Sequence, residues 1–182
     1  MTLFEEALLA MRGCWRLLWR DPAAFDDFNL TIQGFWRSFA VIVPVFVLAY
    51  PMFVSLHDEA NEVAAAAGEA PHELRLGVSY LYLLAGILLW PLVAAVLARL
   101  TGVAHNYVRY MIIYNWMIVP TTAVMLIPHL LLFVVVVHAA FVFSLYLSWY
   151  VAKAALQTTA PIAFVFLLAE FALTYGLGVL IR

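Results

Sequence analysis

Charged side chains are scarce in this sequence. Asp, Glu, Lys and Arg make up 11% of its 182 residues, against about 25% in ordinary soluble domains. Hydrophobic residues make up 67%, and the mean hydropathy is +1.01. This composition excludes a typical soluble domain and indicates an integral membrane protein. The single cysteine, Cys14, excludes an internal disulfide. With no basic cluster to attract phosphates, we expect no nucleic-acid partner.

Catalytic and cofactor motifs are also missing. The sequence contains no GxSxG, HExxH, CxxC or phosphate-loop pattern. A transition-metal site needs three or four converging ligands, and the spacing of the histidines and acidic residues does not supply them. We therefore expect a non-enzymatic protein with no catalytic residues, no cofactor and no metal.

Five hydrophobic runs are long enough to cross a bilayer, which takes about 20 apolar residues. They cover residues 38–56, 76–98, 108–128, 130–152 and 161–181. The predicted fold is all-α, with a five-helix transmembrane domain over residues 38–182 after an interfacial cytoplasmic segment over residues 1–37. In the loop after the first run, four consecutive alanines predict a short surface helix that ends near Gly68.

Basic residues set the predicted orientation, because cytoplasmic loops are enriched in Lys and Arg. With the N-terminus inside, only Arg75 and Arg182 fall outside. The other seven of the nine basic residues fall inside: Arg12, Arg16, Arg20, Arg37, Arg99, Arg109 and Lys153. This distribution predicts a multi-pass protein of the bacterial inner membrane with a cytoplasmic N-terminus and a periplasmic C-terminus.

Residues 2–19 show a helical period, with apolar side chains on one side and arginines on the other. We expect this amphipathic helix to lie in the plane of the membrane, because tryptophan favours the headgroup level and arginine attracts anionic lipid. Its membrane-surface residues would be Arg12, Trp15, Arg16, Trp19 and Arg20. The alternative is a lid docked against the cytoplasmic ends of the spans.

A bend is predicted at Asp21 and Pro22, because proline suits the first turn of a new helix and disfavours helix in the residue before it. The polar residues that follow are Asp26, Asp27 and Asn29. We expect them to be solvated loop residues. The alternative is an ion or headgroup site.

Glu170 stands out as the one acidic residue deep inside a hydrophobic run. An ionisable group at that depth costs about 2.5 kcal/mol or more unless it is paired or hydrogen-bonded. At about 1.5 Å per residue, Asn115, Ser144 and His138 lie at comparable depths and complete a predicted intramembrane polar cluster. Glu170 then belongs to an ion or proton pathway with His138 as relay, fixes helix packing, or faces a partner's span.

The third and fourth runs form a hairpin with aromatic and proline markers. Residues 114–122 begin with Tyr114 and include Pro120, Pro128 lies at the outer turn, and residues 143–150 alternate serine with aromatics. With five spans over a cytoplasmic N-terminal segment, this pattern resembles the bacterial relatives of the Yip1 domain family over residues 76–181. Eukaryotic members are implicated in membrane trafficking with small GTPases, but no GTPase-contacting motif is matched here. The resemblance implies a non-enzymatic multispan protein.

Two functions are carried forward. The first is a scaffold or accessory subunit that acts through a membrane-protein partner or a second copy of itself, within the lipid bilayer. The alternative is a small oligomeric transporter or channel component that uses Glu170.

Overall fold

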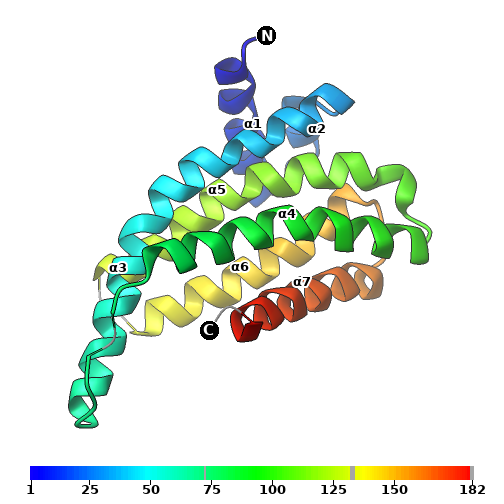
Figure 1. Cartoon of the computed structure of the whole chain (residues 1–182). Coiled ribbons are helices and arrows are strands. Elements are labelled where there is room, and N and C mark those ends of the chain that lie inside the picture. Colours follow the sequence, from blue (N-terminus) through cyan, green and yellow to red (C-terminus); the bar gives the residue numbers. More distant parts are fainter. Residues whose placement is uncertain (72, 132–133, 181–182) are drawn as a thin grey trace.

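The computed structural model describes residues 1–71, 73–131 and 134–180, which form helices without a strand. The prediction of an all-α protein is confirmed. Five long helices lie side by side (Figure 1). They are α3 (Ile42–Ala66), α4 (Leu76–Leu100), α5 (Tyr107–Leu131), α6 (Val134–Ala155) and α7 (Ala160–Leu180).

Three helical segments within the described residues are long and apolar enough to cross a membrane: Ile32–Ala66, Leu76–Leu100 and Ala160–Leu180. They match the first, second and fifth predicted runs and support a membrane protein, whereas the crossing of α5 and α6 stays a prediction. The fourth run was predicted from residue 130, which instead belongs to α5. The outer turn predicted at Pro128 is therefore wrong, because α5 continues through Pro128 to Leu131. The predicted end of the fifth run, residue 181, lies outside the described residues.

The helical segment of the first run is longer than predicted. It begins with α2 (Ile32–Ser38) and η2 (Phe39–Val41), and α3 then continues past residue 56 to Ala66. The alanines are helical and the helix ends near Gly68, as predicted, but they continue α3 instead of forming a short helix of their own, because alanine is the strongest helix former and no proline or glycine lies between residue 56 and Gly68. Gly68 ends the helical stretch with a φ of +74°, a left-handed conformation that favours glycine. This end of α3 projects beyond the other long helices (Figure 1).

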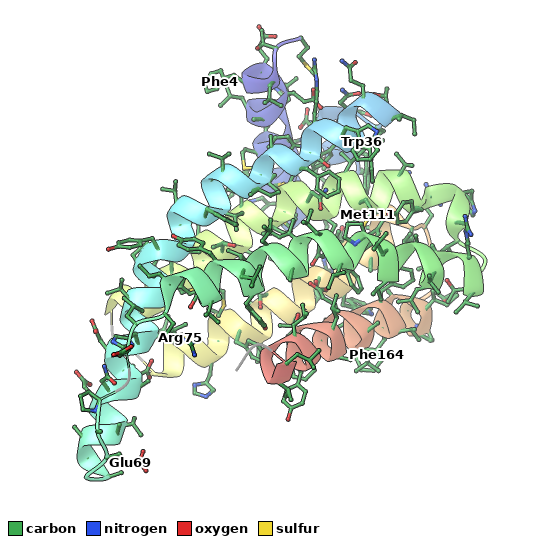
Figure 2. All side chains as sticks on the ribbon, in the orientation of Figure 1. Phe4, Trp36, Glu69, Arg75, Met111 and Phe164 are labelled. Carbon is green, nitrogen blue, oxygen red and sulfur yellow. The ribbon has the colours of Figure 1, made fainter. Side chains whose placement is uncertain are left out.

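The central helix is α5, which packs against α3, α6, α1 and α2. Its N-terminal half is buried on almost every side, as expected for a helix that is apolar all round. The buried residues there are Tyr110, Met111, Ile112, Ile113, Asn115, Trp116 and Met117. Figure 2 shows Met111 among the long helices. Residues on this helix can therefore reach several neighbours at once.

The helix α1 (Leu3–Leu18) begins at Thr2, whose hydroxyl accepts a hydrogen bond from the Glu5 amide. One face packs against α5 and the short helix η1 (Pro22–Asp27). The buried residues on that face are Glu6, Ala10, Gly13, Cys14 and Leu17. Figure 2 shows Phe4 directed away from the long helices, and Trp15 is also exposed. The helix thus docks on the bundle and presents aromatic side chains outward.

The predicted bend after α1 is present. Pro22 begins η1, and the Asp21 side chain caps it by accepting a 2.9 Å hydrogen bond from the Ala23 amide. This turn brings the end of η1 back against α1, where Gly13 allows close approach. A Cβ on Gly13 would lie 2.7 Å from the ring of Phe28.

Candidate functional site at Glu170

Glu170 is held by hydroxyl groups from two other helices. Tyr114 of α5 donates a 2.6 Å hydrogen bond to Oε1, and Ser148 of α6 donates a 2.6 Å hydrogen bond to Oε2. Each carboxyl oxygen therefore has a partner from a different helix, which offsets much of the cost of placing the group in an apolar run. The three residues join α5, α6 and α7 at one point.

The positions of these residues along their helices explain the meeting. Tyr114 and Ser148 each lie about 10 Å from the end of their helix that adjoins the α4–α5 or α6–α7 connection, and Glu170 lies about 15 Å from the start of α7. The long side chains of Tyr114 and Glu170 bridge the remaining difference. Counting residues along each helix therefore places Tyr114, Ser148 and Glu170 at comparable depths, although we predicted other partners for Glu170.

Asn115 has a different partner from the one we predicted. Its amide donates a 2.8 Å hydrogen bond to Ser38 Oγ, and both residues are buried. Because successive residues of a helix point about 100° apart, Tyr114 faces Glu170 while Asn115 faces the first helical segment. Asn115 thus joins α5 to the end of α2.

Ser144 and His138 both lie on α6, at different distances from Glu170. Ser144 lines the same cavity as Glu170, and its hydroxyl donates to the Phe141 carbonyl at 2.7 Å. His138 is exposed and lies about 15 Å along α6 from Ser148. That separation is too long for His138 to hydrogen-bond Glu170 while Ser148 does so.

Tyr114 and Ser148 were missing from the predicted cluster. Ser148 lies one helical turn from Ser144, so a full count of hydroxyls on that face would have included it. Tyr114 carries a polar hydroxyl on an apolar ring and was treated only as a family marker. Aromatic hydroxyls at matched depth are the signal that would have completed the trio.

A cavity of about 430 Å³ adjoins Glu170 between α5, α6 and α7. Its oxygen-bearing side chains are Tyr114, Thr121, Thr122, Ser144, Ser148, Glu170 and Thr174. Its apolar walls include Met52, Met117, Met125, Phe141, Leu145 and Phe171. The cavity is therefore an apolar space with one carboxyl and several hydroxyls.

A second, smaller cavity of about 160 Å³ lies on the other side of Glu170, next to α4. Glu170 and Tyr114 line both cavities, together with Ile118 and Thr174. The hydrogen bond between Tyr114 and Glu170 consequently joins two residues that line both spaces.

An aromatic cluster fixes the position of Tyr114. Its ring centroid lies 5.6 Å from that of Tyr110 and 5.8 Å from that of Trp90. The Trp90 indole donates a 3.2 Å hydrogen bond to the Tyr110 hydroxyl, and Phe166 packs edge-on against Tyr110 at 5.5 Å. Tyr114 is thereby positioned by α4 and α7 as well as by its own helix.

The predicted membrane-surface arginines bind carboxylates within the chain. Arg12 donates to Asp27 at 2.5 Å, and Arg16 donates to Asp27 at 3.1 Å and to Asp21 at 2.7 Å. The Asp27 side chain is only 3% exposed, so our expectation of a solvated loop residue is wrong for Asp27, because the turn at Pro22 carries it back onto α1. The hydrogen bond from Arg12, with a second from Arg16, lowers the pKa of Asp27.

The remaining polar residues of this segment differ in environment. Asn29 donates a 3.2 Å hydrogen bond to Glu6, whereas Asp26 is exposed. Glu6 in turn accepts a 3.0 Å hydrogen bond from Arg37 of α2. These contacts fasten the first residues of α1 to α2.

The other three predicted surface residues lie at the end of α1. Arg20 donates a 2.5 Å hydrogen bond to the hydroxyl of Tyr146 on α6. Trp15 and Trp19 are exposed, and their rings meet edge to face at 6.0 Å. These tryptophans leave an aromatic surface that the described part of the chain does not cover.

Among the described residues, no group of three or more His, Cys, Asp or Glu side chains converges as a metal site. Comparisons with protein-family models, curated proteins and solved structures found no match. The resemblance to the Yip1 domain family therefore stays a prediction.

Proposed function

We propose that this chain is a component of a small oligomeric transporter or channel in which Glu170 serves a ligand or ion inside the membrane. The observation that carries the proposal is the position of Glu170 and Tyr114 in the walls of two cavities. A carboxyl that only fixed helix packing would need its two hydroxyl partners but no adjoining space. The cavity therefore favours the transport alternative over a purely structural carboxyl.

The membrane setting belongs to the same proposal. All five long helices cross the bacterial inner membrane, with the N-terminus in the cytoplasm and the C-terminus in the periplasm, and α1 lies at the cytoplasmic interface. The excess of basic residues at the predicted inner ends supports this orientation. The exposed Trp15 and Trp19 support an interfacial position for α1, because tryptophan favours the headgroup level.

The test is proton flux in liposomes that contain the purified protein and an internal pH-sensitive dye. Glu170→Gln removes the ionisable group but keeps its size and its ability to hydrogen-bond Tyr114 and Ser148. We expect the wild-type protein to dissipate an imposed pH gradient and Glu170→Gln to lose this activity. Glu62→Gln, the same change on the exposed end of α3, is the matched control and should retain it. Equal flux in wild type and Glu170→Gln, or no flux in either, would refute the proposal.

A scaffold or accessory role is the second candidate, as implied by the resemblance to the Yip1 domain family. The outward aromatic surface formed by Phe4, Trp15 and Trp19 favours it, because large exposed apolar patches mark lipid or protein contacts. Purification in a mild detergent tests it. A stoichiometric membrane-protein partner would support the scaffold role, and a clean monomer under several conditions would contradict it.

A further inference from the structure

Four of the six hydroxyl groups that line the larger cavity already donate their hydrogens to other acceptors. Tyr114 and Ser148 donate to Glu170. Ser144 donates to the Phe141 carbonyl at 2.7 Å, and Thr121 donates to the Met117 carbonyl at 2.8 Å. A hydroxyl has one hydrogen and two acceptor lone pairs. These four groups therefore offer lone pairs to the cavity rather than hydrogens.

The carboxyl group also retains acceptor capacity. An ionised carboxylate has about four lone-pair positions, and Tyr114 and Ser148 occupy one on each oxygen of Glu170. No Lys, Arg or His is among the described residues that line the cavity. The polar lining is thus rich in acceptors and carries one potential negative charge, which suits a monovalent cation with hydrogen-bond donors and disfavours an anion.

The size and the apolar walls of the cavity indicate what the ligand contains besides its cation. At about 430 Å³, it is far larger than the roughly 30 Å³ that one water molecule takes in the liquid. A divalent ion would usually require more than one carboxylate. Methionine walls adapt to apolar groups of different shapes, and Phe141 and Phe171 add aromatic surface. The space therefore fits an apolar body attached to the cation.

From this lining, we infer that the cavity binds an organic ammonium ion, an apolar amine whose charged nitrogen lies against Glu170 and whose hydrocarbon part lies among the methionines and phenylalanines. The inference rests on the proposed function in one respect, that the cavity at Glu170 admits a ligand. It adds the chemical class of that ligand. The ammonium hydrogens would bond to Glu170 and to the free lone pairs of Ser144 and Thr121.

Equilibrium dialysis in nanodiscs tests this inference with phenylbutylamine and the neutral phenylbutanol as probes. Empty nanodiscs measure partition into lipid, and Glu62→Gln is the matched carboxyl control. We expect saturable binding of the amine to wild type and to Glu62→Gln, weakened about tenfold or more in Glu170→Gln by the loss of a charge-assisted hydrogen bond. Unchanged weak binding of the alcohol would show that the Glu170→Gln cavity is intact.

A second variant distinguishes a loss of binding from a loss of the fold. Ser144→Ala together with Thr121→Val removes two acceptors and leaves the Glu170 carboxyl in place, so the amine should bind a few-fold more weakly while the thermal unfolding midpoint stays near that of wild type. Equal affinity for amine and alcohol, or equal amine affinity in wild type and Glu170→Gln, would overturn the inference.

The two proposals can fail separately. Proton flux that depends on Glu170 without amine binding would leave the proposed function in place and remove the ammonium inference. Amine binding that depends on Glu170 without proton flux would keep the ligand class and contradict proton movement through the site.

Discussion

The hydroxyl of Tyr114 donates a 2.6 Å hydrogen bond to Oε1 of Glu170, and both side chains line both cavities. One hydrogen bond therefore joins α5 to α7 at a point that both spaces adjoin.

Removing this hydroxyl should cost little stability, and only when Glu170 is present. We expect Tyr114→Phe to lower the free energy of unfolding by about 0.6 kcal/mol, the average for polar contacts between membrane helices. In a Glu170→Leu background the same change should cost nothing. Unfolding in mixed detergent measures both. Tyr107→Phe, which loses a 2.9 Å bond to the Pro91 carbonyl, is the control and should cost the same in both backgrounds. An equal cost of Tyr114→Phe with and without Glu170 would contradict the geometry.

Cys14 reports the docking of α1, because this single cysteine is 1% exposed. Burial also raises the pKa of its thiol, so the docked protein should react slowly with a maleimide. Asp27→Asn removes the negative charge to which Arg12 and Arg16 donate. We expect labelling to accelerate several-fold, because solvent screens the attraction of exposed guanidinium groups. Asp26→Asn, at the exposed neighbouring position, should leave the rate unchanged. A rate in Asp27→Asn equal to that of wild type would show that these bonds do not hold α1.

Low pH should also weaken the docking of α1. The bond from Arg12 lowers the pKa of Asp27, and the bond from Arg16 lowers that of Asp21. A carboxyl with a lowered native pKa stabilises the docked state fully above its unfolded pKa of about 3.9, and this contribution is lost as pH falls through the native pKa. The measurement is the rate at which dithiodipyridine labels Cys14 in the folded protein, divided by the rate in SDS at the same pH. This ratio should stay constant as the pH falls from neutral to about 4 and should rise below that. In Asp27→Asn this rise should be smaller. An identical pH profile in both proteins would exclude Asp27 as its source.

Gly34 is required by the turn before α2. A Cβ at this position would lie 1.8 Å from the Asn29 carbonyl oxygen. Because that atom belongs to the backbone, Gly34→Ala must displace the start of α2, and we expect a loss of about 1–3 kcal/mol in the free energy of unfolding. Gly176→Ala in α7 is the control, because a Cβ there meets no described atom within 4 Å and alanine favours helix by up to about 1 kcal/mol. Equal unfolding midpoints for the two variants would contradict the close approach at Gly34.

The helices were predictable from hydropathy, but their ends were not. The second run was predicted over residues 76–98, and α4 spans Leu76–Leu100. The first run was predicted to end at residue 56, with a short helix over the alanines that ends near Gly68, whereas α3 is one helix that continues to Ala66. Hydropathy locates the edge of an apolar stretch, whereas a helix ends where the backbone requires it, here before Gly68.

The partners of Glu170 were not predictable for a different reason. The helices α5, α6 and α7 are apolar on all sides, so their sequences carry no period that shows which face meets which neighbour. Glu170 was identified from its chemistry alone. Its pairing with Tyr114 rather than Asn115 depends on helix rotation, which tertiary packing sets.

The hydrogen bonds from Arg12 and Arg16 to Asp27 were also not predictable. The arginines of this segment were assigned to lipid because arginine attracts anionic headgroups. The bend at Pro22 was predicted, but its direction was not, and that direction brings Asp27 onto Arg12 and Arg16.

The most direct test of the central claim is whether Glu170 can be reached by a small apolar reagent. Dicyclohexylcarbodiimide forms stable adducts with protonated carboxyls in apolar surroundings, and peptide mass spectrometry locates them. In membranes that contain the folded protein, we expect an adduct at Glu170 that forms more slowly when phenylbutylamine is present. An unmodified Glu170 in the folded protein, with modification only after unfolding in SDS, would contradict an accessible cavity and leave the carboxyl as a packing contact.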